Sequence, residues 1–232
     1  MSPHTYVALF AAPLRHNYRG KFRSNQPISG VCPTSRCGTC VYKDQTSATI
    51  LIDTEYQHFK KIYTDGSKDP QNNTNGCVFV IPELKVSKGF KLQSHMSIFM
   101  CELTATFLAL NWIQDFKPLN TVIFVYSLSG LQAIKGSINK VKKYIIYDIY
   151  NSFTSLSNIG INVILEWIPI HVGILGNELA DKEDKHSLSL KNIYVFNPLY
   201  KEDIKTLSRT FFERYVAKKM GHQPKRKTFI WY

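Results

Sequence analysis

The sequence predicts an α/β fold: a mixed five-stranded sheet, with three antiparallel strands and then parallel strands, flanked by helices. Three observations predict it. Short strand-like runs come first, between residues 60 and 92. Two continuous apolar runs follow, TVIFVYS at 121–127 and INVILEWIPI at 161–170, and such runs are typical of strands buried on both faces. Segments with helical periodicity precede, separate and follow these two runs.

The first strands are short and are separated by turn-forming residues. KKIYTDGS (60–67) indicates a strand that ends at a turn, and NGCVFVI (75–81) and KVSKGFKL (85–92) indicate two more. The segment 97–116 then predicts a helix, because its apolar residues recur at three- and four-residue steps. The residues that carry this period are Ile98, Cys101, Ala105, Leu108 and Trp112.

The second half of the pattern alternates buried strands with helices. TVIFVYS continues directly into LSGLQAIKG (128–136), which predicts a helix. KVKKYIIYDIYNSFTSL (140–156) predicts a second, amphipathic helix. After INVILEWIPI comes a turn at Gly173 and Gly176, and NELADKEDKHSL (177–188) then predicts the last helix.

These elements divide the chain into three parts. Residues 1–58 are rich in turn formers and lack sustained periodicity, so we expect a loop-rich arm to which no fold is assigned. Residues 59–190 form the predicted domain. Residues 191–232 form a basic extension, in which 201–219 predicts a helix followed by a tail. No run approaches the ~18 apolar residues of a membrane span, and MSPHT lacks the basic residues of a secretion signal. We therefore expect an intracellular protein, nuclear or cytoplasmic, that is not secreted.

The formal net charge of +12 is concentrated near the C-terminus. Residues 191–232 hold 10 basic and 3 acidic side chains, whereas residues 59–190 hold 13 and 11. A basic balance of this kind suits a polyanionic partner, and nucleic acid is the usual one. A solvated tail that keeps the protein soluble explains the same charge equally well. No feature of the sequence indicates a protein partner.

Three of the five cysteines, Cys32, Cys37 and Cys40, have the spacing C-x4-C-x2-C. A structural zinc site needs four ligands, and His16 or His58 would have to supply the fourth. The alternative is free thiols in a reducing compartment, which the odd number of cysteines favours.

Four residues that can carry chemistry lie where predicted elements begin or end. Asp65 follows the first strand, Glu102 lies in the first turns of the 97–116 helix, and Asp181 lies early in the last helix, with His171 in the turn before it. Taken singly, each acid has an ordinary explanation as a turn former, a helix-start acid or a surface charge. Together, converging carboxylates without a clustered Lys or Arg indicate a site for a hard cation, with Mg²⁺ as the first candidate.

Four blocks of sequence resemble one known family. They are IYTDGSK, SIFMCELTATFLAL, VYSLSGLQAI and EWIPIHVGILGNELADKEDK, and they occur in the family's order over about residues 60–188. The family is that of the type 1 ribonuclease H domains, specifically those encoded by non-LTR retrotransposons. The resemblance implies a ribonuclease H-like fold and an endonuclease that hydrolyses the RNA strand of an RNA–DNA hybrid with two Mg²⁺ ions.

The resemblance also implies a role for each site residue. Asp65 matches the acid that bridges both metals, Glu102 the acid on the product-side metal, and Asp181 the terminal ligand. His171 matches a histidine that assists proton transfer or product release. The residues expected to contact substrate are Gly66, Ser67, Ser127 and Asn177.

One acid of the family is missing. The family has a further carboxylate at the end of the central strand, in a run such as Tyr-Ser-Asp-Ser-Leu-Ser, whereas this chain has Tyr126, Ser127, Leu128 and Ser129. Either Asp-Ser is deleted, or Ser127 occupies the position of the acid. A neutral hydroxyl is a poor metal ligand, so we expect the nuclease activity to be severely reduced or absent. The alternatives are a non-catalytic protein that binds hybrid or double-stranded nucleic acid, and a translated relic without function.

Overall fold

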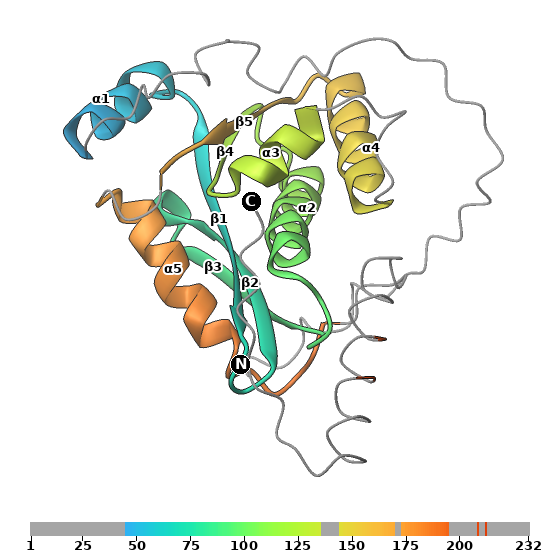
Figure 1. Cartoon of the computed structure of the whole chain (residues 1–232). Helices are drawn as coiled ribbons and strands as arrows, with labels where there is room; N and C mark the ends of the chain where they lie inside the picture. The colour runs from blue at the N-terminus through green and yellow to red at the C-terminus, as the bar shows by residue number, and fades with distance from the viewer. Residues whose placement is uncertain (1–44, 136–143, 170–172, 195–207, 209–211, 213–232) are drawn as a thin grey trace, which may run out of the picture.

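One five-stranded sheet forms the centre of the protein, with its strands in the order β3-β2-β1-β4-β5 (Figure 1). β2 pairs antiparallel with both β1 and β3, and β4 pairs parallel with both β1 and β5. The mixed sheet predicted from the sequence is therefore confirmed. The structure is a computed structural model, and it describes residues 45–135, 144–169, 173–194, 208 and 212. The strands are β1 (Lys60–Asp69), β2 (Thr74–Ile81), β3 (Val86–Leu92), β4 (Asn120–Val125) and β5 (Asn162–Trp167).

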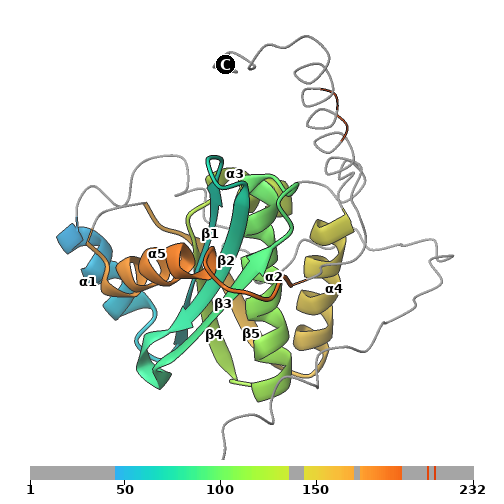
Figure 2. The same ribbon diagram turned by 90° about the horizontal axis from the view of Figure 1, so that it is seen from below.

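Helices cover both faces of the sheet (Figures 1 and 2). α2, α3 and α4 contribute side chains to one buried apolar cluster, and α1 and α5 contribute to the other. The α2 to α5 helices agree with the predicted segments to within a few residues. The helices are α1 (Gln45–Glu55), α2 (Ile98–Phe116), α3 (Leu128–Lys135), α4 (Tyr144–Asn158) and α5 (Leu175–Ser187), with a short 3-10 turn, η2 (Pro82–Leu84).

β1 is longer than the sequence pattern predicts. The pattern indicates a strand that ends at a turn directly after Asp65, whereas β1 continues to Asp69. Its parallel pairing with β4 ends at Thr64, opposite Val125, and its antiparallel pairing with β2 continues beyond that point. Asp65 therefore lies within a strand, at the level where the neighbouring β4 ends.

α2 is the helix that places a candidate site residue against β1. It begins after Ser97, whose hydroxyl accepts a hydrogen bond from the Met100 N–H at 3.3 Å, as expected of an N-cap. It ends at Lys117, which has a left-handed backbone conformation (φ 52°). Its apolar side chains pack against the sheet, and Cys101 is fully buried there. This packing fixes the first turns of α2, which carry Glu102, over β1.

α1 is a helix within the segment for which the sequence predicts only a loop-rich arm. Its Ala48 and Ile52 side chains are buried in the same apolar cluster as α5 and the adjacent face of the sheet. Tyr56, just after the helix, packs edge-on against Phe124 of β4 and donates a hydrogen bond to Glu166 of β5 at 3.0 Å. Residues 45–56 thus belong to the packed domain.

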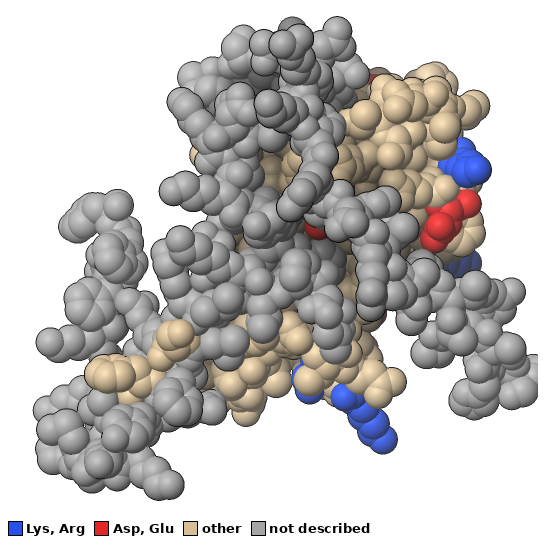
Figure 3. Space-filling model, turned by 90° about the vertical axis from the view of Figure 1, so that its right-hand side faces the viewer, with Lys and Arg blue, Asp and Glu red and all other residues tan. Residues whose placement is uncertain are grey.

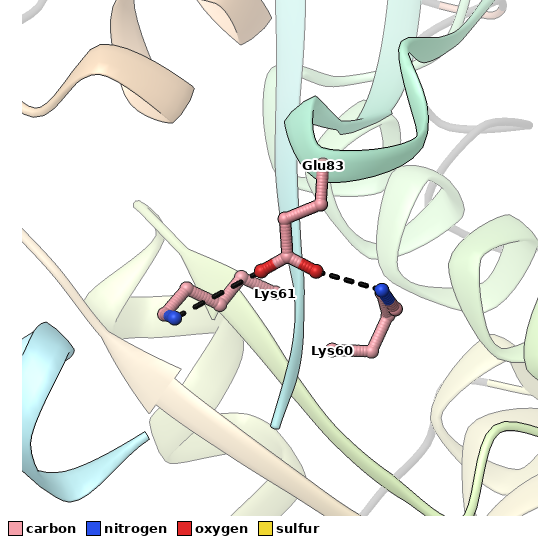
Figure 4. A network of polar contacts seen from close by, with 3 residues as sticks. All are labelled: Lys60, Lys61 and Glu83. Carbon is pink, nitrogen blue, oxygen red and sulfur yellow. Dashed lines mark hydrogen bonds and ion pairs between the residues drawn. The ribbon is translucent and has the colours of Figure 1, made fainter. Parts of the chain in front are cut away.

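A polar cluster ties the start of β1 to the turn after β2 (Figure 4). The Glu83 carboxylate accepts a hydrogen bond from Lys60 Nζ at 2.8 Å, and its other oxygen lies 3.8 Å from Lys61 Nζ. Lys60 and Lys61 are the first residues of β1, so this cluster lies at the start of the strand and Asp65 lies further along it.

Two predictions concern segments that the structure does not describe. The three cysteines Cys32, Cys37 and Cys40 lie outside the described residues, as does the helix expected over 201–219 except for Ser208 and Phe212. Within the described residues, no helix is both long and apolar enough to cross a membrane.

Candidate functional site

Asp65, Glu102 and Ser127 lie around one small pocket. β1 contributes Thr64 and Asp65, α2 contributes Glu102, and the junction of β4 with α3 contributes Ser127. The pocket has a volume of about 10 Å³, which is room for about one water molecule. It lies at the carboxyl ends of the parallel strands, where α/β sheets hold their ligands. The other lining residues are Leu103, Thr106, Val125, Tyr126, Gly130, Leu131 and Ile134.

Asp65 is the most perturbed carboxyl group of this site. Burial, together with the negative charge of Asp184, raises the pKa of Asp65 from 3.8 to about 8. The Gly66 N–H opposes this rise by donating a hydrogen bond to Asp65 Oδ1 at 2.8 Å. Asp181 and Glu102 add smaller increases. The strand thus holds a carboxylate where several negative charges converge, which favours protonation or a nearby cation.

Gly66 permits the close contact of β1 with α2. A Cβ atom at this position would lie 2.6 Å from the backbone N of Glu102 and 2.7 Å from the backbone carbonyl carbon of Cys101. Only glycine fits at such a distance, so the sequence Asp-Gly brings Asp65 and Glu102 to the same pocket. Burial raises the pKa of the Glu102 carboxyl, and the nearby hydroxyl of Ser127 opposes that rise.

Ser127 is the N-cap of α3. Its hydroxyl accepts a hydrogen bond from the Gly130 N–H at 3.1 Å, and its carbonyl oxygen accepts one from the Leu131 N–H at 2.9 Å. Only Tyr126 and Ser127 connect β4 to α3. No carboxylate lies at this junction, and the Ser127 hydroxyl lines the pocket beside Glu102.

α5 brings two carboxylates toward Asp65. Asp181, the predicted residue, is 30% exposed, and its Oδ2 atom accepts a hydrogen bond from Lys185 Nζ at 2.6 Å. Asp184, one turn later, is 1% exposed, and burial raises its pKa from 3.8 to about 6. Of the two, Asp184 has the larger effect on Asp65.

Asp184 is the residue that the sequence analysis missed. The available signal is its spacing of three residues from Asp181, because residues at i and i+3 share a helix face. The run Asp181-Lys-Glu-Asp184 has the composition of a solvated surface, which hid that signal. Only the packing of α5 against the sheet shows that Asp184 faces inward.

Two predicted substrate contacts lie on β1 and α5, the elements that carry Asp65 and Asp184. Ser67 follows Asp65 by two residues on β1, so both point to the same face of the sheet. Its buried hydroxyl is near enough to Asp184 to lower the pKa of that carboxyl, but it makes no hydrogen bond of normal geometry. Asn177, in the first turn of α5, is 2% exposed.

Asn177 also connects α5 to the end of β4. Its backbone carbonyl accepts a hydrogen bond from the Tyr126 hydroxyl at 2.8 Å. Its side-chain Oδ1 atom is buried and has no hydrogen-bond partner among the described residues. His171 lies outside the described residues, so its predicted place beside the acids stays a prediction.

The carboxylates fit Mg²⁺ in chemistry but not in arrangement. Oxygen ligands with negative charge are the ones that this cation prefers. Yet within the described part of the chain, no three His, Cys, Asp or Glu side chains are grouped closely enough to hold a metal ion. Asp181 is directed to Lys185, and the side chain beside Glu102 at the junction of β4 with α3 is the neutral hydroxyl of Ser127. The two-metal arrangement that the resemblance implies is therefore not assembled by these residues.

Comparison with known proteins identifies the family. The family model for RNase H matches residues 57–189, which include β1 to β5 and all of the described acids above. A search of curated proteins finds no match to the chain. The matched region is more than half of the 232 residues, and it coincides with the sheet and helices that form the candidate site. The chain belongs to the RNase H family.

Proposed function

We propose that this protein is a ribonuclease H-like domain derived from a non-LTR retrotransposon, that it binds RNA–DNA hybrids, and that its ability to cleave their RNA strand is impaired. The observation that carries the proposal is the junction of β4 with α3. There Ser127 caps the helix and lines the pocket. The resemblance leads us to expect a carboxylate at this junction, and the sequence has none between Tyr126 and Leu128. The retrotransposon origin is supported by the order of the four sequence blocks.

The proposed site keeps the other residues of the family pattern. Asp65, Glu102 and Asp181 are the proposed metal ligands and catalytic acids, and His171 is the proposed group for proton transfer or product release. Because the acids are not assembled for two metals, we expect weak divalent-cation binding. The residues proposed to contact the nucleic acid are Gly66, Ser67, Ser127 and Asn177.

Hybrid binding is supported by family and by charge. A-form helices expose their 2′-hydroxyl groups in a wide minor groove, where a protein can recognise RNA without reading bases. The net charge of +12 favours contact with phosphates. On the side shown in Figure 3, the visible described surface is mostly uncharged, with Lys side chains (blue) and Asp or Glu side chains (red) at its margins. Much of the positive charge belongs to residues 191–232, which we propose as an additional phosphate contact.

The first experiment compares cleavage by the natural chain with cleavage by variants of the β4–α3 junction. Labelled RNA–DNA hybrid is incubated with Mg²⁺ or Mn²⁺ and the natural protein, a variant with Asp-Ser inserted after Ser127, or a variant with Ala-Ser inserted there. The two insertions have the same length and differ only in the carboxylate. Ser127→Asp adds the carboxylate without changing the length of the connection.

We expect the natural chain and the Ala-Ser variant to be inactive or nearly so, and the Asp-Ser variant to cut. Activity of Ser127→Asp instead would show that Ser127 itself occupies the position of the acid. Cleavage by the natural chain at a rate comparable to the Asp-Ser variant, abolished by Asp65→Asn, would contradict the proposed impairment.

Binding is measured separately, by fluorescence anisotropy of labelled hybrid in EDTA. Specific binding by the natural chain, tighter than to double-stranded DNA, is the expected result. An absence of binding to either nucleic acid would favour a relic over a binding protein.

A further inference from the structure

One positively charged side chain, that of Lys185, lies among the acids of the candidate site. Lys185 is on α5, four residues after Asp181, and its Nζ atom donates a hydrogen bond to Asp181 Oδ2 at 2.6 Å. α5 packs across β1, β2 and β3 (Figures 1 and 2). Asp181 is close enough to Asp65 for its charge to raise the pKa of the Asp65 carboxyl. A carboxylate oxygen that accepts this hydrogen bond is less available to a metal ion.

The charge of Lys185 acts on more than its direct partner. The hydrogen bond to Asp181 and the charge of Asp181 raise the pKa of Lys185, and the charges of Asp65 and Glu178 add to that rise. In return, the ammonium lowers the pKa of Asp184. One positive charge is thus held near several of the carboxylates that surround Asp65.

Other lysines of the described residues are directed elsewhere. Lys60 and Lys61 pair with Glu83 at the opposite end of β1, and Lys68 donates a hydrogen bond to the Met96 carbonyl at 2.8 Å. Within the described part of the chain, Lys185 is therefore the cation that an ion pair places at this site.

We infer that Lys185 is a tethered counter-cation that competes with divalent metal ions for Asp181 and repels them from the neighbouring acids. This inference rests on the proposed function, because it concerns the same site. It adds a second cause of weak metal binding, independent of the carboxylate missing at Ser127. The Lys185 side chain is 67% exposed, so solvent screens its charge and its effect on metal binding is moderate. Removal of this charge should tighten metal binding about three- to tenfold.

The test measures Mn²⁺ binding to the purified full-length chain, by the electron paramagnetic resonance signal of the free ion. The variants are Lys185→Gln and Lys182→Gln. Lys182 is exposed on the same helix, and its replacement changes the net charge by the same amount. Thermal unfolding confirms that each variant is folded.

We expect Lys185→Gln to bind Mn²⁺ about three- to tenfold more tightly than the natural chain, and Lys182→Gln to resemble the natural chain. The gain should disappear in an Asp181→Asn background, because the competition acts through Asp181. A merely structural role of Lys185 would not produce that coupling.

Three results would overturn the inference. They are equal or weaker Mn²⁺ binding by Lys185→Gln, an equal gain from Lys182→Gln, and no measurable binding by Lys185→Gln at millimolar Mn²⁺. Hybrid binding in EDTA is a separate readout of the proposed function. If the chain does not bind hybrid, that part of the proposed function is wrong. The comparison of Mn²⁺ affinities would still decide the role of Lys185.

Discussion

Asp65 shows how a single residue can oppose the stability of its own fold. Its carboxyl group is surrounded by protein and faces other carboxylates, so the folded state favours the protonated form. The folded pKa, about 8, is above the unfolded value of 3.8. Its contribution to stability is therefore complete below about pH 4 and is lost as the pH rises toward 8. A carboxyl group whose ionisation destabilises the folded protein is typical of a functional position.

Replacement of this carboxyl group should therefore stabilise the metal-free protein at neutral pH. We expect Asp65→Asn to raise the free energy of unfolding by up to about 4 kcal/mol at pH 7 in EDTA, and to have little effect near pH 4. Urea unfolding at the two pH values measures this difference. Asp115→Asn, at an exposed position of α2, is the matched control. Equal stability of Asp65→Asn and the natural chain at pH 7 would contradict the electrostatic account.

Gly66 should tolerate no side chain. In Gly66→Ala, the new Cβ atom would meet backbone atoms of α2 that cannot rotate away. We expect a loss of about 1–3 kcal/mol in the free energy of unfolding, as for other overpacked positions. Thermal or urea unfolding measures it. A variant as stable as the natural chain would show that β1 and α2 can separate without cost.

At the scale of the element, the start of α3 depends on one side chain. The Ser127 hydroxyl accepts the hydrogen bond that an N-cap normally accepts. We expect Ser127→Ala to lower the free energy of unfolding by about 1 kcal/mol, whereas Ser127→Asp retains a capping oxygen and should lose much less. Urea unfolding of the two variants compares them. No loss of stability in Ser127→Ala would show that the cap is unimportant, and equal destabilisation by both variants would show that a carboxylate cannot cap the helix in this pocket.

α1 is the element whose role is least visible in the sequence. Ile52 is 3% exposed in the apolar cluster, whereas Ile50 on the same helix is 57% exposed. We expect Ile52→Ala to lower the free energy of unfolding by about 2 kcal/mol or more, and Ile50→Ala to change it by less than about 0.5 kcal/mol. Unfolding by urea again measures both. Similar small effects of the two would mean that α1 is not docked in solution.

At the scale of the whole molecule, charge and fold are separated along the chain. The matched family region carries the site, whereas residues 191–232 hold a large share of the net charge. We expect a chain that ends at residue 190 to bind RNA–DNA hybrid more weakly and with a smaller dependence on salt, because fewer phosphates are contacted. Anisotropy titrations between about 50 and 200 mM NaCl measure both quantities. An unchanged salt dependence would assign the phosphate contacts to the domain itself.

Much of this molecule follows from local patterns in the sequence. The apolar runs of β4 and β5 and the helical period of α2 predict the mixed sheet and its helices, because burial on one or two faces leaves a periodic trace. The family blocks identify Asp65, Glu102 and Asp181 as candidates. The absence of a carboxylate after Tyr126 is likewise evident in the sequence alone. These features depend on residues that are neighbours in the chain.

Other features depend on which elements lie side by side. The buried Asp184, the ion pair of Asp181 with Lys185 and the cap formed by Ser127 arise where α5, β1 and the β4–α3 junction come together. α1 has too weak an apolar pattern to be predicted, and it is held by contacts with β4 and β5 more than 60 residues away. The sequence by itself determined the type of fold and the absence of a carboxylate between Tyr126 and Leu128. Only the tertiary structure decided which charges act on Asp65, because the energy of a buried charge depends on distance and solvent in three dimensions.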